Sequence, residues 1–531
     1  MKKTLFSLAV LTGLLSAQTN SPAWNPDNGD GTYRNPVVYA DYSDPDVIRI
    51  GSDYFMVSSS FVQTPGLPLL HSKDLVHWTI VNHIVQNIPY GDFKKPLHGN
   101  GIWAPALRYH NGWYYVYYGD ADYGIFMSRT KNPFGRWEPL TLVQQSKGWI
   151  DPCPLWDEDG QAYLVHAFAK SRAGFNSRLT VHKMSPDGKQ LLDSGTVVFD
   201  GTAKHPTIEG PKLYKRSGWY YIFAPAGGVP QGWQTILRSR NIFGPYEDKI
   251  VLEQGSSTVN GPHQGAWITA EDSSSWFIHF QDKDAFGRIV HLQPVHWEND
   301  WPLMGIDKDG NGIGEPVLNY KIPYSKSFAA PGVPQTSDEF TSSEIGLQWQ
   351  WEANHNDSWY SLSKRKGYLR LFSQISDSVN LYNIPNVIGQ KIPAPEFKAS
   401  VKMEYFPSSE GEKAGLIVLG MDYAVLYMRK EGKSFKLVQS QCLNASSDNN
   451  EEIQEEKTIG SNTVFMRVNV NDSGICSFQY SADGTNYTDI GKTFKARKGR
   501  WVGARICLFS RTADNGHKPG YADFDFLRFT K

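Results

Sequence analysis

Cysteine is scarce in this chain, which has only four in 531 residues. They are Cys153, Cys442, Cys476 and Cys507, and four cysteines allow three disulfide pairings that the sequence does not separate. Any disulfide is expected among the last three, because Cys153 stands alone in the first part of the chain. Nothing near Cys153 supplies a dedicated histidine partner for a catalytic thiol. We therefore interpret Cys153 as a small packing residue.

Net charge is also nearly absent. The 53 Lys and Arg residues balance 54 Asp and Glu residues, which leaves a formal charge of -1. A chain that binds nucleic acid or an anionic membrane by charge carries a basic excess, so no nucleic-acid partner is expected. A neutral partner is predicted instead. The 17 Trp, 27 Tyr and 27 Phe residues suit stacking against sugar rings, although most of them must fill hydrophobic cores.

One long apolar run stands out in the sequence, and it lies at the N-terminus. It extends from Leu5 to Leu15, follows Lys2 and Lys3, and gives way to small residues near Ala17. This pattern is typical of a signal peptide, here residues 1–17, and the run is too short to span a membrane. We expect an exported protein, periplasmic or secreted, with no membrane span.

No long amphipathic helix is evident beyond this segment, and a prolyl step recurs instead. The five steps are Asp44-Pro45, Ala104-Pro105, Asp151-Pro152, Gly210-Pro211 and Pro262-His263. Each precedes an aromatic run with strand character, namely 54–57, 113–116, 162–165, 219–222 and 276–279. Copies at intervals of about 50 to 60 residues are typical of a β-propeller with one copy per four-stranded blade. Residues 18–325 are therefore predicted to form a five-bladed β-propeller.

Three acidic residues accompany these steps: Asp44, Asp151 and Glu209. The innermost strands of a propeller converge on one axis, so residues at equivalent blade positions become neighbours. Asp-Pro alone is a frequent turn opener, and a single such residue would more often be structural. Because all three are expected at one blade position, we predict that they face a common pocket. Three carboxyl groups around one cavity indicate acid/base hydrolysis.

A second domain is predicted after residue 337. Residues 326–337 are rich in Pro, Gly and small polar side chains and indicate a linker. Beyond them, apolar residues alternate with polar ones, as in Phe397, Ala399, Val401, Met403 and Tyr405, and again at Phe524 and Phe526. Alternation with period two predicts strands with one buried face. Residues 338–531 are predicted to form an antiparallel β-sandwich, and the fold class is all-β.

These motifs carry a resemblance to a known family. The chain contains Asn35-Pro36-Val37, Ser43-Asp44-Pro45-Asp46, Ile102-Trp103-Ala104-Pro105, Ile150-Asp151-Pro152, Ile208-Glu209-Gly210-Pro211 and Gly287-Arg288. In this order they resemble glycoside hydrolase family 43, whose members are five-bladed β-propeller enzymes acting on β-xylosides and α-L-arabinofuranosides. The stretch 279–305 and the domain beginning Asp338-Glu339-Phe340 resemble the xylosidase and arabinofuranosidase branch, which carries a lectin-like β-sandwich.

The resemblance implies a role for each carboxyl group. Asp44 would be the general base, Glu209 the general acid, and Asp151 the residue that tunes and orients the acid. An inverting glycosidase needs this division, because one carboxylate activates water while one protonated carboxyl serves the leaving oxygen, the two being roughly 6.5–9.5 Å apart. Asp46, two residues after Asp44, is an alternative base if the strand is regular through Pro45.

The resemblance also implies binding residues. Arg288 would contact sugar hydroxyls at the bottom of the pocket, with a surface salt bridge as its alternative. Trp103 and Phe61 are candidate walls of the sugar subsite, or core residues. His263 resembles a central histidine that in some relatives holds a metal ion, often calcium, through water. No cofactor is expected to be required, and a structural Ca²⁺ near the propeller axis is an alternative to a histidine without metal.

The predicted function is that of an inverting, exo-acting glycosidase that removes terminal α-L-arabinofuranosyl residues from plant cell-wall polysaccharides or oligosaccharides. Preference for the arabinofuranoside rests on Val62-Gln63-Thr64, which stand where many β-xylosidases of this branch have an acidic-aromatic pair, and which we expect at the pocket rim. A β-xylosidase, with dual activity included, is the alternative. A carbohydrate-binding propeller without catalysis is the alternative of another class. The sandwich is expected to supply a loop to the pocket rim or to support the propeller.

Overall fold

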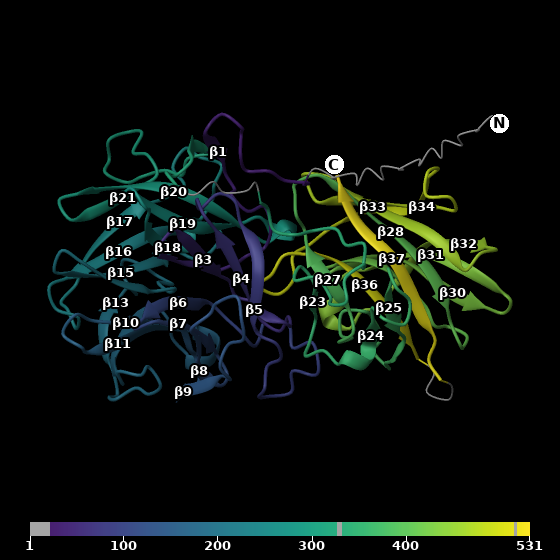
Figure 1. The fold of residues 1–531 in the computed structure, drawn as a ribbon, viewed down its shortest axis with the longest axis horizontal. Coiled ribbons are helices and arrows are strands. Elements are labelled where there is room, and N and C mark those ends of the chain that lie inside the picture. The colour runs from purple at the N-terminus through teal and green to yellow at the C-terminus, as the bar shows by residue number, and fades with distance from the viewer. Residues whose placement is uncertain (1–21, 327–331, 514–517) are drawn as a thin grey trace, which may run out of the picture.

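The computed structural model describes residues 22–326, 332–513 and 518–531. The predicted signal peptide, residues 1–17, lies outside the described residues, as does part of the predicted linker, residues 326–337. Two β-rich bodies stand side by side (Figure 1). The first is a ring of five sheets, and the second is a pair of sheets packed face to face. In the described parts of the chain, no helix is long and apolar enough to cross a membrane.

The ring consists of five four-stranded antiparallel sheets, each built from four consecutive strands. Each predicted aromatic run forms the second strand of its blade: β3, β7, β11, β15 and β19. The blades are β2 (Asp46–Ile50), β3 (Asp53–Val57), β4 (Gly66–Ser72) and β5 (Thr79–Val85); β6 (Pro105–His110), β7 (Trp113–Asp120), β8 (Gly124–Thr130) and β9 (Thr141–Gln145); β10 (Trp149–Trp156), β11 (Ala162–Phe168), β12 (Arg178–Met184) and β13 (Thr196–Asp200); β14 (Lys212–Arg216), β15 (Trp219–Ala226), β16 (Trp233–Ser239) and β17 (Glu247–Leu252); β18 (His263–Thr269), β19 (Ser275–Asp282), β20 (Arg288–Glu298) and β21 (Trp301–Met304). The prediction of a five-bladed β-propeller is confirmed.

Hydrophobic clusters fill the spaces between neighbouring blades. One lies between the first and second blades and contains Phe55, Leu69, Val116 and Phe126. Similar clusters join the other adjacent pairs, including the first and last blades. Outside the blades, β1 (Thr32–Arg34) pairs with β22 (Asn319–Lys321) in a separate two-stranded sheet that joins the two ends of the propeller segment. Most aromatic residues of the propeller therefore serve packing.

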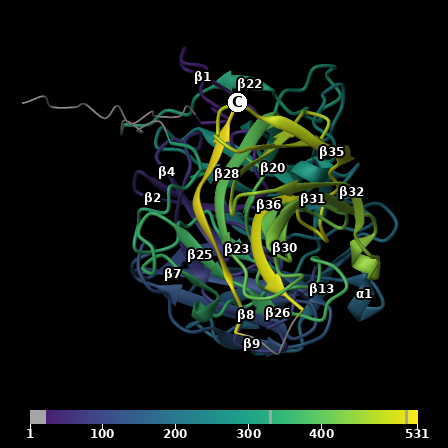
Figure 2. The same ribbon diagram turned by 90° about the vertical axis from the view of Figure 1, so that its right-hand side faces the viewer.

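The second body is a sandwich of two large sheets (Figure 2). Its strands are β23 (Gln350–Trp351), β24 (Tyr360–Ser361), β25 (Leu369–Phe372), β26 (Gln374–Ile375), β27 (Ile388–Lys391), β28 (Phe397–Phe406), β29 (Lys413–Leu419), β30 (Tyr423–Glu431), β31 (Ser434–Cys442), β32 (Glu452–Ile459), β33 (Thr463–Val470), β34 (Ile475–Ser481), β35 (Thr488–Lys495), β36 (Arg505–Thr512) and β37 (Tyr521–Thr530). The alternating apolar residues of β28 all enter the core between the sheets. The predicted sandwich is thus confirmed. At the C-terminus a register shift between β28 and β37 leaves Phe524 in that core and Phe526 outside it.

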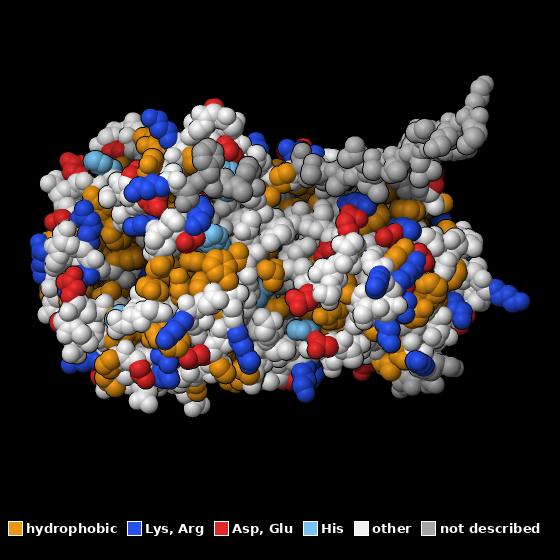
Figure 3. Space-filling model, in the orientation of Figure 1, with side chains coloured by type: hydrophobic (Ala, Val, Ile, Leu, Met, Phe, Trp, Pro, Cys, Tyr) orange, Lys and Arg blue, Asp and Glu red, His pale blue; other side chains and the backbone are white. Residues whose placement is uncertain are grey.

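Short helices are confined to connections: α1 (Lys170–Ala173) and the 3-10 turns η1 (Asp284–Phe286), η2 (Asp357–Trp359) and η3 (Ala445–Ser447). On the face seen in Figure 3, basic and acidic side chains are interspersed, in keeping with the balanced composition. All four cysteines are free and buried. No disulfide forms among them, so the structure does not test where one would be placed, and each of the last three thiols lies within a packed core. Burial raises the pKa of the Cys153 thiol, which agrees with its interpretation as a packing residue.

Candidate active site

Prolyl steps set the backbone at the start of the innermost strands. In three blades the residue after the proline is paired with a residue of the second strand of the same blade. The pairs are Asp46 with Val57, Cys153 with Val165 and Lys212 with Phe223. The residues two positions earlier are Asp44, Asp151 and Gly210, and all three have left-handed backbones with φ of 54°, 56° and 58°. Side-chain-bearing residues in this conformation are uncommon and cluster at functional sites.

Glu209 lies one residue earlier than the position shared by Asp44 and Asp151. The expectation that all three acidic residues occupy one blade position is therefore wrong. In the fourth blade that position belongs to Gly210, where a Cβ atom would lie only 2.5 Å from Cγ of Gln264. Glycine is required here by both the positive φ and the close approach. The offset turns the N–H of Gly210 toward Asp151, which accepts it at 2.8 Å.

Asp44 is a buried carboxylate held by one cation and one hydroxyl. Nη1 of Arg288 lies 3.0 Å from its Oδ1 and 3.2 Å from its Oδ2. Oγ of Ser59 donates to Oδ2 at 2.7 Å. These contacts fix the orientation of a carboxylate that is only 3% exposed. Charge-assisted contacts of this kind are the strong ones, so Asp44 presents its oxygens in a fixed geometry.

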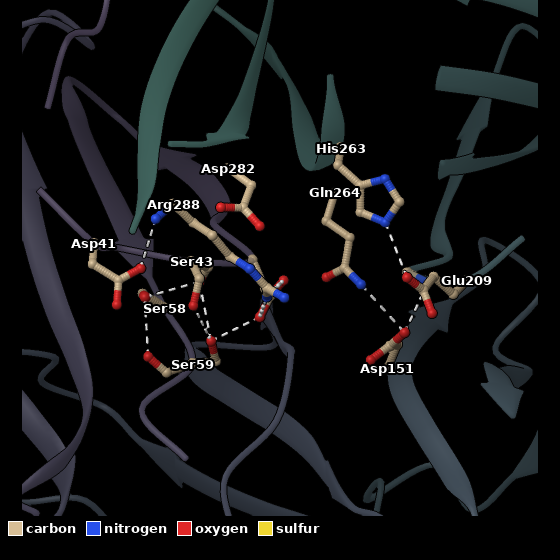
Figure 4. A network of polar contacts seen from close by, with 12 residues as sticks. Asp41, Ser43, Ser58, Ser59, Asp151, Glu209, His263, Gln264, Asp282 and Arg288 are labelled. Atoms are coloured by element: carbon tan, nitrogen blue, oxygen red, sulfur yellow. Dashed lines mark hydrogen bonds and ion pairs between the residues drawn. The ribbon is translucent and has the colours of Figure 1, made fainter. Parts of the chain in front are cut away.

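Asp151 and Glu209 lie together on the other side of the site, away from Arg288 (Figure 4). His263, the first residue of β18, places its Nε2 3.0 Å from Oε1 of Glu209. Nε2 of Gln264 approaches Oδ2 of Asp151 at 3.4 Å. The side chain of Glu209 is 29% exposed, whereas Asp151 is 2% exposed. Of these two carboxyl groups, Glu209 is the one that a ligand can reach.

The carboxyl group of Asp151 has a raised pKa. Burial, followed by the nearby carboxyl groups of Glu209 and Asp44, raises the pKa of Asp151 to about 8. Two carboxyl groups that share a dry site cannot both ionise at low cost. The pair of Asp151 and Glu209 therefore holds one proton in the pH range in which isolated carboxyl groups have lost theirs. That proton belongs to the pair rather than to one residue.

All seven residues predicted for the site line one cavity of about 470 Å³, including Phe61 and Trp103. The rings of Phe61 and Trp103 are 6.2 Å apart, and the ring of Trp501 lies 6.4 Å from Trp103. Together they form an aromatic wall beside the polar groups. A cavity with apolar walls and a few convergent polar groups is typical of small-ligand sites.

Among the lining residues that sequence reasoning missed are Gln264 and Trp501. Gln264 follows His263 at the fifth prolyl step, so its position in the repeat could have indicated it. Trp501 comes from the loop before β36 in the sandwich. It confirms the expectation of a loop at the pocket rim, although no repeat or motif marks the residue that fills that role.

The segment predicted at the rim lies elsewhere. Val62, Gln63 and Thr64 are at most 2% exposed and do not line the cavity. Thr64 is bonded to the sandwich, since its N–H donates to the carbonyl of Trp351 at 3.1 Å and its hydroxyl to the carbonyl of Ala353. The rim expectation is therefore wrong, because this segment is buried between the two bodies.

Asp46 is excluded as the base by its surroundings. It is fully buried, and its Oδ2 accepts from the N–H of Leu107 and from Nη1 of Arg108, both at 2.7 Å. The Asp46 and Arg108 pair ties the first blade to the second beneath the pocket. The side chain of Asp46 does not line the cavity.

Calcium near His263 stays a prediction. Nδ1 of His263 is buried without a hydrogen-bond partner, which leaves one nitrogen for a ligand. In the described parts of the chain, no group of three His, Cys, Asp or Glu side chains could hold a metal ion. Calcium takes six to eight oxygen ligands, so the residues at this position do not by themselves fit it.

Comparisons with known proteins agree with this geometry. Residues 33–302 match the model of glycosyl hydrolases family 43, and residues 337–530 match the β-xylosidase C-terminal concanavalin A-like domain. A putative β-xylosidase of Xylanibacter ruminicola is 42% identical over 92% of this chain and 88% of its own. The non-reducing end α-L-arabinofuranosidase BoGH43B of Bacteroides ovatus is 30% identical over 82% of each chain.

The fold recurs in a solved structure as well. The GH43 protein BlXynB from Bacillus licheniformis superposes with a TM-score of 0.81 at 25% identity, covering 94% of this chain and 99% of its own. The likeness thus includes the sandwich as well as the propeller. With the carboxyl groups of Asp44, Asp151 and Glu209 around one pocket, and with both family models matched, this chain belongs to glycosyl hydrolase family 43.

Proposed function

We propose that this glycoside hydrolase is an exo-acting β-D-xylosidase that releases terminal xylosyl residues from plant cell-wall polysaccharides or oligosaccharides by single displacement. The observation that carries the proposal is the pocket itself, in which Asp44 and Arg288 face the pair of Glu209 and Asp151. The name of the relative from Xylanibacter ruminicola supports the xyloside. The arabinofuranoside preference expected from Val62-Gln63-Thr64 loses its support, because that segment does not reach the pocket.

α-L-Arabinofuranosidase activity is the second candidate, and the name of the Bacteroides ovatus relative favours it. Both sugars are pentoses with similar hydroxyl groups, so one small pocket can accept either. We expect dual activity, with the xyloside cleaved faster.

The residues have complementary roles in the proposed mechanism. Asp44, held by Arg288 and Ser59, accepts a proton from the attacking water. Glu209, which faces the cavity, gives its proton to the glycosidic oxygen as the bond to the anomeric carbon breaks. Asp151 keeps a proton within the pair and orients the acid through the N–H of Gly210. Attack opposite to the leaving group inverts the anomeric configuration.

The size and walls of the pocket support exo action. A cavity that is closed on one side by three aromatic rings and on the other by the carboxyl groups suits the end of a sugar chain. An exported location belongs to the proposal as well, and purification from the periplasm or the medium is its test. Activity after chelation distinguishes a calcium ion completed by water near His263 from a histidine without metal.

The deciding experiment compares para-nitrophenyl β-D-xylopyranoside with the α-L-arabinofuranoside, using wild type and Asp44→Asn. Faster release from the xyloside, lowered at least 10²-fold in the variant, is the expected result. Faster arabinofuranoside cleavage would reverse the order of the two candidates. Proton NMR of the first product formed should show the α-anomer of xylose, and a β-anomer would contradict single displacement.

The variant Glu209→Gln distinguishes an enzyme from a non-catalytic sugar-binding propeller. An enzyme loses turnover while it keeps affinity for the sugar, as measured by calorimetry. A binding module has no turnover in the wild type to lose.

A further inference from the structure

Asp41 lies three residues before Asp44 and contacts both bodies of the molecule. Its side chain is buried, with 5% of the residue exposed. Oδ1 accepts the backbone N–H of Arg288 at 2.8 Å, a contact seen in Figure 4. Oδ2 accepts the backbone N–H of Gly503 at 2.9 Å. One carboxylate thus joins the start of β20 to the loop of the sandwich that carries Trp501.

The two backbones approach closely at this point. A Cβ atom at Gly287 would lie 2.5 Å from Cγ of Asp41, and one at Gly503 would lie 2.8 Å from Cα of Gly287. Real Cβ atoms do not approach so closely, so neither glycine can be replaced without movement. Next to them, the N–H of Ala504 donates to the carbonyl of Ala285 at 2.7 Å. The backbones of the two segments pack directly against each other, and the carboxylate of Asp41 lies between them.

Lys391 is an electrostatic neighbour of this carboxylate, but only at longer range. Among the described residues, no ion pair within 4 Å includes Asp41, so its partners are the two backbone N–H groups. Backbone donors of rigid segments hold an acceptor in a narrower range of positions than a long, flexible ammonium side chain would. Asp41 does not line the cavity, so it acts on the pocket only through the residues that it holds.

Those residues stand on two walls of the pocket. Arg288 carries the guanidinium that grips Asp44, and Trp501, two residues before Gly503, adds its ring to the aromatic wall. We propose that Asp41 is a positioning residue that sets, through two backbone N–H groups, both the hold of Arg288 on Asp44 and the place of Trp501 over the pocket. The proposal rests on the proposed function, in which Asp44 is the base.

The test uses the full chain with Asp41→Asn. The amide keeps the shape, but its NH₂ group meets one of the two N–H donors, so one bond is lost together with the charge. We expect kcat/KM to fall about 10²-fold, the size of effect that small misplacements of a site produce, and KM to rise as Trp501 moves.

Asn354→Ala is the matched control. Asn354 exchanges two hydrogen bonds of 2.8 Å with the backbone of Ile88 across the same domain interface, and it does not line the pocket. This variant should lower the melting temperature while kcat/KM and KM stay unchanged. If Asp41→Asn leaves kcat/KM and KM within twofold of wild type, or if Asn354→Ala changes them equally, the proposal is overturned.

A second readout does not depend on activity. Freed from Asp41, the loop at 499–503 should be cut faster by trypsin after the exposed Arg500, as mass spectrometry of the native protein would show, whereas Asn354→Ala should not speed this cut. An unchanged rate in Asp41→Asn would contradict the positioning role by itself. If wild type cleaves neither glycoside, the proposed function fails, and the tryptic rate still decides whether Asp41 holds the loop.

Discussion

At the scale of single residues, the same amino acid takes three roles in this site according to its neighbours. Asp44 is paired with Arg288, Asp46 is locked to Arg108 beneath the pocket, and Asp151 has other carboxyl groups as its electrostatic neighbours. Sequence spacing separates none of these cases. Their surroundings do, because the charge on a carboxyl group is stabilised or opposed by the groups within a few ångströms.

The pH dependence of catalysis should follow the pair of Asp151 and Glu209. Because the pKa of Asp151 is raised to about 8, the pair holds its proton below that pH and loses it above. We expect kcat/KM to fall as the pH rises past about 8. In Asp151→Asn the neighbouring negative charge is gone, so the basic limb should move to lower pH.

Steady-state kinetics from pH 5 to 10 on both proteins would check this expectation. A basic limb at the same pH in both would show that Asp151 does not tune the acid.

Asp46→Asn should damage stability rather than catalysis. The substitution leaves the guanidinium of Arg108 buried beside a neutral amide, and breaking a buried ion pair costs about 3–5 kcal/mol. Thermal or urea unfolding would show this loss, while kcat per folded molecule should stay within a few-fold of wild type. A loss of kcat as large as that of Asp44→Asn would restore Asp46 as the candidate base.

At the scale of elements, the prolyl steps are the part of the site that the sequence predicts best. They recur because each blade starts its inner strand in the same way, so the residues that flank the step reach the axis. The offset of Glu209 is visible in the sequence, since Gly210 stands between it and Pro211, but its physical reason, the close approach of Gly210 to Gln264, is not. That contact joins blades four and five and leaves no pattern in the local sequence.

Gly210→Ala should therefore lower both activity and stability. A left-handed backbone costs a residue with a side chain about 1–2 kcal/mol, and here the new methyl group would also press on Gln264 and shift the N–H that orients Asp151. Gly112→Ala is the control, because Gly112 also has a positive φ, of 80°, but nothing within 4 Å of an added Cβ. The control should lose stability alone. Equal kcat in both variants would show that the Gly210 contact does not matter for catalysis.

The sheet of β29, β30, β31 and β36 is covered on both sides. One face packs into the core between the sheets. The other is covered by Leu381, Tyr382, Ile384 and Val387, and the ring of Tyr382 stacks on His98 of the propeller at 3.8 Å. Because the chain itself covers this face of the sheet, the arrangement agrees with the expectation that the sandwich supports the propeller.

At the scale of the whole molecule, the two bodies share one core. The hydrophobic cluster of the sandwich includes Ala23, Tyr39, Ala285, Phe286 and Ile289 from the first part of the chain. Domains that share a core are expected to unfold together. Calorimetry of the full chain should show a single transition, and two resolved transitions would contradict the shared core.

A chain ending at residue 325 should be poorly soluble, since it exposes these apolar residues and lacks Trp501. Coexpression with residues 332–531 is the control and should recover soluble protein. A soluble, fully active propeller alone would show that the sandwich is dispensable.

The sequence by itself determined the repeat, the all-β class, the residues at the prolyl steps and the family, because these depend on local backbone preference and on motifs that stay together in the chain. Only the tertiary structure decided that Trp501 completes the pocket, that Val62-Gln63-Thr64 are buried, that the cysteines stay apart and that Asp41 links both bodies. Each of these facts depends on which surfaces pack together across long separations in sequence, and periodicity carries no record of such contacts.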